Sequence, residues 1–473
     1  MRTIPAVPLS PFAMPVAATL SVLLAAALVI AAPPKLVLIG VAGVIAAFIL
    51  ATNPRRLWLL LIALLPFSIE VKNILGAGNH LTVPTEALAP IAALAIVFAV
   101  LKTGRLEWTR SALHFAVAFY LGLMAASLAW SEIPLDTVKA LARTACYFVA
   151  GYMLCQLAVR KPSDLTFPLK LLAVATSLLV LYGLYTQFKH GVRVYQDIAE
   201  PFFEEHCVYA AWLCFPAAFA LGALTQPIRY RRIILAFALL LSFGILLSFV
   251  RGAWIGMASL AVYLVLRQRS QAGRQLLAAI GLFIVIGLIL VPALGLQHLF
   301  MDRWETLFDT RYVSNESRID RWMAAVAMWK DSPIWGLGFG CYPDLYFDYV
   351  YYTFAYEATV RMGAHNLYLE ILAELGILGL VAYLTIIAFF FRETRQLYRG
   401  AAGDPNIRAI ALGLESMMVV YLIHTVVNNL GPSDKIEVAF WTTLGLAVSL
   451  RCAVTGQQAR SASEGSHIGD SNK

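Results

Sequence analysis

The segment RMGAHNLYLEILAELG, residues 361–376, places a histidine and several polar residues where a long apolar run begins. A neutral imidazole such as that of His365 can accept a proton from a hydroxyl group, because its ordinary pKa lies near ambient pH. Asn366 is a residue type that caps helices. Glu370 and Glu374 lie inside the run, where ionisable side chains are costly and mark candidate functional sites. His365 is therefore a candidate base, and a capping or interfacial histidine is the alternative.

Several arginines fall in segments that we expect on one side of a membrane, outside the basic loops described below. They are Arg143, Arg193, Arg251, Arg303, Arg311, Arg318, Arg321 and Arg361. Planar guanidinium groups suit phosphate and diphosphate oxygens, and a site near the membrane surface suits a phosphate that carries a lipid tail. The alternative is that single loop arginines pair with nearby acids or reach lipid headgroups. Arg143 and Arg251 are the stronger candidates, because a charge within the bilayer is costly.

The elements that must position these residues are membrane helices. Of the 473 residues, 60% are hydrophobic and only 14% are charged, which excludes an ordinary soluble domain. The net charge of +8 does not indicate a nucleic-acid partner, because the Lys and Arg residues occupy short loops between apolar runs. This pattern is typical of the cytoplasmic loops of a polytopic membrane protein. The basic loops are 53–56, 102–105, 159–161, 229–232, 267–274 and 392–399.

The apolar runs predict an all-α polytopic integral membrane protein with about 12–14 transmembrane helices and one large external loop that contains short helices. The expected spans are 13–32, 36–52, 57–70, 84–101, 112–130, 137–158, 165–187, 207–225, 233–249, 252–266, 275–296, 366–391, 407–429 and 436–454. The division of the chain is then an N-terminal bundle (1–296), the large loop (297–365), C-terminal transmembrane helices (366–454) and a disordered cytoplasmic tail (455–473).

Residues 233–266 predict a helical hairpin. As one helix these 34 residues would measure about 51 Å, which is too long for a single crossing, and both ends carry basic segments that favour the cytoplasm. The chain must therefore cross and return, with its turn at SFVRGAW. This places Arg251 on the external side, slightly below the membrane surface.

Two external loops stand out. The loop 188–206 carries Arg193. In the loop 297–365, NESRIDRWMAAVAMWKDSP predicts an amphipathic helix, with Ser317 and Asp320 as a capping box and an end at 331–333. The following GLGFG predicts a turn.

The helical spacing separates His365 from the two glutamates. At 100° per residue, Glu370 and Glu374 lie 140° to 180° from His365 (an estimate from helix geometry), so we expect them to bind neighbouring helices instead. Polar groups at membrane depth there are Glu415, His424, Asn428 and Asn429. A proton or ion path through these residues is the rival interpretation.

The sequence lacks the signatures of soluble enzymes, and its six cysteines form no CxxC pair. The external loops hold no compact carboxylate cluster with metal spacing. We therefore expect neither a metal nor a cofactor.

Three segments together resemble the O-antigen ligase and polymerase superfamily over about residues 240–390. They are SFVRGAWIG in the hairpin, SRIDRWMAAVAMWKDSPIWGLGFG in the large loop and AHNLYLEILAELGILGLVAYL at the next helix. The resemblance implies an inverting, metal-independent glycosyltransferase in the bacterial inner membrane, with the large loop and the active site on the periplasmic side. Its donor would be an undecaprenyl-diphosphate-linked glycan. Its acceptor would be lipid A-core for a ligase or a second lipid-linked glycan for a polymerase.

On the matching positions, the resemblance implies His365 as the base or acceptor-orienting residue and Arg251 and Arg318 as ligands of the donor diphosphate. Arg143 and Arg193 would be further diphosphate ligands. Possible supporting residues are Arg321, Asn366, Glu370 and Glu374. We favour the ligase over the polymerase. A small-anion transporter of bicarbonate type is the alternative from another class, but it predicts inverted repeats, and the sequence shows no internal repeat.

Overall fold

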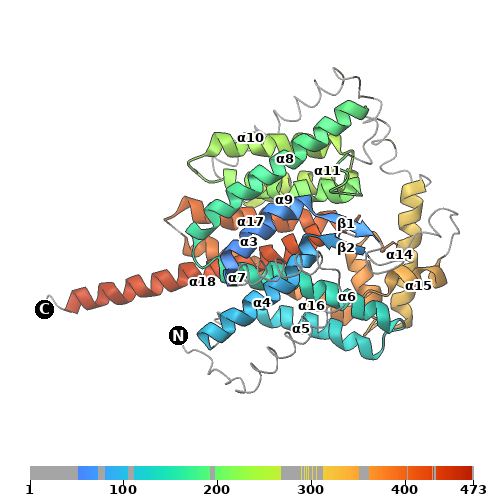
Figure 1. The fold of residues 1–473 in the computed structure, drawn as a ribbon, viewed down its shortest axis with the longest axis horizontal. Coiled ribbons are helices and arrows are strands. Elements are labelled where there is room, and N and C mark those ends of the chain that lie inside the picture. Colours follow the sequence, from blue (N-terminus) through green and yellow to red (C-terminus); the bar gives the residue numbers. More distant parts are fainter. Residues whose placement is uncertain are drawn as a thin grey trace, which may run out of the picture.

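The computed structural model describes residues 52–72, 80–104, 111–191, 198–267, 313–350, 362–401, 403–428, 430 and 433–470, and six single residues between 289 and 305. The predicted spans 13–32, 36–52 and 275–296 lie almost entirely outside these residues. In the described part, helices form nearly all of the regular structure (Figure 1). The elements before the hairpin are α3 (Pro54–Leu64), η1 (Leu65–Phe67), β1 (Ile69–Lys72), β2 (His80–Val83), α4 (Thr85–Thr103), α5 (Ala112–Ala126), η2 (Ser127–Ala129), α6 (Pro134–Phe148), η3 (Val149–Met153), α7 (Leu154–Ala158), η4 (Pro162–Leu165), α8 (Thr166–His190) and α9 (His206–Leu224). The remaining elements are α10 (Arg231–Leu247), α11 (Arg251–Arg267), α14 (Val313–Asp331), α15 (Tyr342–Tyr349), α16 (Leu367–Gly400), α17 (Pro405–His424) and α18 (Asp434–Asp470).

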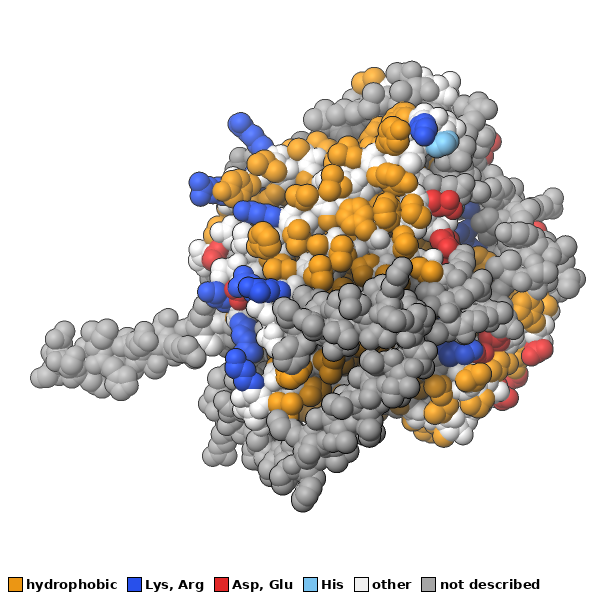
Figure 2. Space-filling view, in the orientation of Figure 1, with side chains coloured by type: hydrophobic (Ala, Val, Ile, Leu, Met, Phe, Trp, Pro, Cys, Tyr) orange, Lys and Arg blue, Asp and Glu red, His pale blue; other side chains and the backbone are white. Residues whose placement is uncertain are grey.

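Seven helices of the described part are long and apolar enough to cross a membrane, which confirms the all-α polytopic membrane protein. They are Thr85–Thr103, Ala112–Ala129, Pro162–His190, His206–Leu224, Leu367–Gly400, Pro405–His424 and Asp434–Gly456. Large apolar side chains such as Phe115 and Leu266 are about three-quarters exposed, at 74% and 75%, as lipid-facing residues are. Figure 2 shows hydrophobic side chains across the middle of the bundle and Lys and Arg along the edge from which α18 projects.

The two ends of the bundle are named here by their helices. The α14 end is the end at which α14 and α15 lie, and the α18 end is the opposite one, from which α18 projects (Figure 1). α10 and α11, with 17 residues each, form the predicted hairpin, and α11 begins at Arg251. α9 is the most enclosed of the seven apolar helices and packs against α17, α10 and α11.

α16 is the helix expected at 366–391, but it is broken at Gly376, whose φ of 63° and ψ of −165° are not helical. The break frees backbone groups, and residues 333–338 of the preceding loop bind them. Ile377 N donates to Pro333 O (2.9 Å), while Leu337 N and Gly338 N donate to Ala373 O and Glu374 O (both 3.0 Å). A Cβ atom at Gly376 would lie 2.2 Å from Ile334 O, so the close approach of the two segments requires glycine there.

Three further expectations are wrong. The predicted span 57–70 ends as an α-helix at Leu64 and continues into η1, β1 and the antiparallel partner β2, because Pro66 has no N–H group with which to continue the helix. α14 begins at Val313, so Ser317 and Asp320 are buried inside the helix and do not cap it, although the helix ends at Asp331 as predicted. α18 remains helical to Asp470, where we expected a disordered tail from residue 455.

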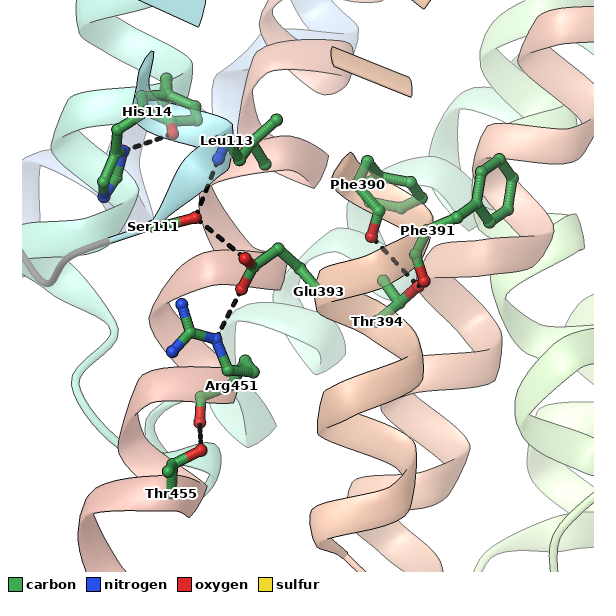
Figure 3. Close-up of polar contacts among 10 residues, drawn as sticks. Ser111, Leu113, His114, Phe390, Phe391, Glu393, Thr394, Arg451 and Thr455 are labelled. Carbon is green, nitrogen blue, oxygen red and sulfur yellow. Dashed lines mark hydrogen bonds and ion pairs between the residues drawn. The ribbon is translucent and has the colours of Figure 1, made fainter. Parts of the chain in front are cut away.

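At the α18 end, buried polar groups neutralise one another. Glu393 of α16 accepts hydrogen bonds from Ser111 Oγ (2.9 Å) and Arg451 Nε (2.5 Å), and Ser111 also caps α5 by accepting from Leu113 N (3.1 Å; Figure 3). Glu415 of α17 accepts from Tyr263 OH (2.5 Å) and Arg267 Nε (3.2 Å). These contacts join α5, α11, α16, α17 and α18.

Candidate functional site

His365 lies at the α14 end, in the segment that leads into α16. Its φ is 51°, a left-handed conformation that costs a non-glycine residue about 1–3 kcal/mol. The next residue, Asn366, is the helix cap, as predicted, and its Oδ1 accepts from Tyr368 N (3.0 Å) and Leu369 N (3.1 Å). Leu367 N donates to Thr425 O at the end of α17 (3.0 Å). The position of His365 is therefore fixed by contacts immediately after it.

Two arginines of α14 act electrostatically on His365. Burial, and then the positive charges of Arg318 and Arg321, lower the pKa of His365 to about 3. Its imidazole is consequently neutral at every pH near neutrality. A neutral ring nitrogen next to guanidinium groups can accept a proton while the same guanidinium groups bind an anion.

Arg321 holds the segment in front of His365. Its side chain is fully buried, its Nη1 donates to Met362 O (3.0 Å), and its guanidinium carbon lies 4.5 Å from the centre of the Tyr346 ring. Its Nε and Nη2 have no hydrogen-bond partner in the described part of the chain. Buried donors without a partner are costly, so this site is suited to an anion that would accept from them.

α15 completes the support of α14. Tyr346 OH donates to Asp320 Oδ2 (2.5 Å), and Tyr342 OH donates to Arg321 O (2.7 Å). Burial raises the pKa of Tyr342 well above its usual range. The Tyr342 phenol therefore remains a hydrogen-bond donor at neutral pH.

Arg251, the first residue of α11 in the hairpin, contacts α14. Its Nη2 donates to Asn315 Oδ1 in the first turn of α14 (2.9 Å). Arg251 and Arg318 both act electrostatically on the thiol of Cys207, which lies in the first turn of α9. The starts of α9, α11 and α14 thus gather at one place, and the set Arg251, Arg318, Arg321 and His365 is called the arginine cluster below.

The two glutamates of α16 accept from backbone N–H groups, and only the partner of Glu374 belongs to a neighbouring helix, α15. Glu370 Oε2 accepts from Ala364 N (2.7 Å), directly before His365, and Glu374 Oε1 accepts from Tyr342 N (3.1 Å). The angular argument fails because His365 precedes the helix and the chain turns back over its first turn. Glu370 therefore supports the His365 segment through the backbone.

Arg143 lies elsewhere at the α14 end. It is on α6 and lines a cavity of about 360 Å³ together with Glu370, Glu374 and Glu437. None of the residues of the arginine cluster lines this cavity. Arg193 lies outside the described residues.

Two residues of this region were missed from the sequence. Asn315 carried no signal beyond its place in a polar stretch. Glu437 did carry one, because it is a carboxylate inside the expected span 436–454.

Residues 235–384 match the family model described as O-antigen ligase. The matched range contains most of α10, all of α11, α14 and α15, and the first half of α16. It therefore includes the whole arginine cluster together with Glu370 and Glu374. Arg143 and Glu437 lie outside it. No curated protein matches the chain.

Proposed function

Because residues 235–384 place the protein in the O-antigen ligase and polymerase superfamily, we propose that it is an O-antigen ligase. It would transfer a glycan from an undecaprenyl-diphosphate-linked donor to lipid A-core, at the periplasmic face of the bacterial inner membrane. The observation that carries the proposal is the half-buried His365, held in a left-handed conformation beside Arg318 and Arg321. A neutral base next to an anion site is what glycosyl transfer from a diphosphate requires.

In the proposed reaction the oxygen of an acceptor hydroxyl forms a bond to the anomeric carbon of the donor sugar. The bond between that carbon and the diphosphate oxygen breaks, and its electron pair leaves with the diphosphate. The proton of the hydroxyl passes to a ring nitrogen of His365. Attack from the face opposite the leaving group inverts the anomeric carbon, and no step needs a metal.

Arg251 and Arg318 are the proposed ligands of the diphosphate. Negative charge develops on the leaving oxygen, and fixed guanidinium groups in a site with little water stabilise it. Arg251 follows a 17-residue helix, about 25 Å long, so it lies slightly below the membrane surface, where the phosphates of a lipid-linked donor would be. Arg321, with two donors unused, is a supporting ligand.

The bound diphosphate would also improve His365 as a base. The positive charges of Arg318 and Arg321 disfavour protonation of the imidazole. A diphosphate that neutralises them raises the affinity of the ring for a proton, so the base becomes stronger when the donor is present. Donor binding and proton transfer are coupled in this way.

The test uses cells that lack the gene, complemented with the wild type, with His365→Ala or with His190→Ala. His190 is an exposed histidine at the end of α8 and serves as the matched control. Gels of lipopolysaccharide and of lipid-linked glycan should show bare lipid A-core and accumulated long lipid-linked chains in the deletion and His365→Ala cells. The wild type and His190→Ala should restore transfer.

Other outcomes would contradict the ligase. Lipid A-core capped with a single repeat unit would indicate a polymerase, which uses the same donor chemistry. An unchanged glycan profile in the deletion cells would favour the transporter. Full transfer by His365→Ala would exclude His365 as the base.

A further inference from the structure

The cavity that Arg143 lines is the second polar site of the α14 end. It holds about 360 Å³ and is bounded by residues of α5, α6, α15, α16, α17 and α18. We call it the α6 cavity. Polar groups converge on it, yet most of its walls are apolar, as in sites that bind organic ligands.

The polar side chains of the α6 cavity include both acidic and basic groups. Glu370, Glu374 and Glu437 line the α6 cavity, and Arg143 acts electrostatically on Glu437. Glu437 Oε2 is buried and makes no hydrogen bond in the described part of the chain. A buried carboxyl oxygen without a partner is costly, so this atom calls for a ligand that carries hydrogen-bonding groups such as hydroxyls.

Aromatic rings form another part of the wall. Phe440 and Trp441 lie on α18 next to Glu437, with ring centres 5.3 Å apart and an interplanar angle of 69°. Tyr421 of α17 packs on Phe440 with centres 5.0 Å apart. Carboxylates beside aromatic faces suit a ligand whose rim carries hydroxyl groups and whose faces carry C–H groups. A saccharide has this structure.

The α6 cavity adjoins the segment of His365 but is separate from the arginine cluster. Leu367, two residues after His365, lines it, and so does Glu370, which binds the backbone N–H of Ala364. An inverting displacement brings the nucleophile to the face of the anomeric carbon opposite the leaving group. If the diphosphate occupies the arginine cluster, the attacking hydroxyl must come from another pocket that adjoins His365.

We propose that the α6 cavity binds the acceptor sugar, with Glu437 Oε2 and the Arg143 guanidinium forming hydrogen bonds with its hydroxyl groups. This inference rests on the proposed glycosyl transfer and adds to it the site of the acceptor. It also assigns Arg143 to the acceptor rather than to the diphosphate. Glu370 is a positioning residue that links this cavity to the His365 segment.

The test is a steady-state transfer assay with the purified full-length protein in lipid nanodiscs. The donor is the lipid-linked glycan that accumulates in cells lacking the gene. The acceptor probes are lipid A-core and, separately, the lipid-linked single repeat unit from the same cells. Donor and acceptor are varied in turn for the wild type, Glu437→Gln, Arg143→Gln and Glu132→Gln. Glu132 is an exposed carboxylate outside the cavity and is the matched control.

Glu437→Gln should raise the KM for the acceptor at least about 10-fold, because the carboxyl group that binds the acceptor is replaced by an amide, while the KM for the donor changes less than about twofold. Arg143→Gln should also raise the KM for the acceptor. Arg143 is exposed, so we expect this substitution to leave the fold intact. Glu132→Gln should change neither. An unchanged acceptor KM in both cavity variants, or a rise in the donor KM instead, would overturn the inference.

The result also separates this inference from the proposed function. If the wild type transfers glycan and His365→Ala does not, the proposed function holds whatever the cavity variants do. If His365→Ala transfers at the wild-type rate, the proposed function fails, and with it the basis of the acceptor site.

Discussion

Charged side chains have different kinds of partner at the two ends of the bundle. At the α18 end, Glu393 is bound by Arg451 and Ser111, and Glu415 is bound by Arg267 and Tyr263, so that each buried carboxylate has a cation. At the α14 end, the arginines lie beside a neutral histidine, and carboxylates accept from backbone N–H groups. The carboxylates of these two networks are thus bound by cations, whereas near the proposed site arginines lie close to a histidine and two carboxylates bind backbone N–H groups.

Two unusual backbone conformations lie at the same end of the bundle as the proposed site. The left-handed His365 and the break at Gly376 both lie at the α14 end. Such conformations persist only where the surrounding contacts hold them, and they are concentrated at functional sites. In this protein, the loop segment 333–338 supplies those contacts for Gly376.

The largest expected effect comes from the arginine cluster. Arg251→Ala and Arg318→Ala should each lower the transfer rate about 10²–10³-fold, because a group that stabilises developing charge is lost. Arg399→Ala, an exposed arginine at the α18 end, is the control and should leave the rate unchanged. Rates are measured with purified protein at saturating donor. A loss in the Arg399 variant equal to that in the cluster variants would remove the distinction between the two ends.

Substitutions in the polar network of the α18 end should lower the stability of the protein and leave the transfer rate unchanged. Glu393→Gln leaves the Arg451 side chain, only 16% exposed, without its anion and should destabilise the protein by about 3 kcal/mol. Transfer per folded molecule should not change. Thermal unfolding in nanodiscs measures the loss, and Arg55→Gln, which breaks an ion pair whose arginine is 53% exposed, should lower stability much less. Equal losses in the two variants would contradict this assignment.

A smaller effect is expected at Ser111, which caps α5 and donates to Glu393. Ser111→Ala should cost about 1 kcal/mol, the usual effect of losing a cap. Because both residues belong to one network, the loss should be smaller in the Glu393→Gln background than in the wild type. Strict additivity of the two losses in the double variant would show that the network does not act as a unit.

The smallest effect is expected in the pH dependence of kcat/KM for the donor. The pKa of His365 is lowered to about 3, so the imidazole of the free enzyme stays unprotonated as the pH falls from 8 to 5. The kcat/KM for the donor should therefore show no fall near pH 6.5 from protonation of a histidine. A protonation step near pH 6.5 that disappears in a His365 variant with residual activity would contradict the proposed environment of this residue.

The sequence predicted those parts of the fold that depend on local patterns. The turn before Arg251 followed from the length of an apolar run with basic residues at both ends, and the cap at Asn366 from its residue type. The break in α16 could not be predicted in this way, because it depends on backbone contacts with a segment about forty residues earlier, from Pro333 to Gly338.

The same limit applies to the site. His365, Arg251 and Arg318 were chosen from residue type, expected position and resemblance, and the structure brings them together. Glu374 binds a neighbouring helix, as expected, but the contact of Glu370 with the backbone before His365 was not predicted, because His365 was treated as part of the helix. Glu437 was overlooked although a carboxylate inside an expected span is a signal by itself.

The central proposal is that Arg318 binds the donor diphosphate and that His365 takes part in the transfer. Its most direct test measures donor binding and transfer separately. Thermal stabilisation of the full-length protein by undecaprenyl diphosphate is measured for the wild type, His365→Ala and Arg318→Ala, alongside transfer by each. The account predicts that His365→Ala is stabilised like the wild type but transfers at least about 10²-fold more slowly, and that Arg318→Ala is not stabilised. Normal transfer by His365→Ala, or equal stabilisation of Arg318→Ala, would contradict it.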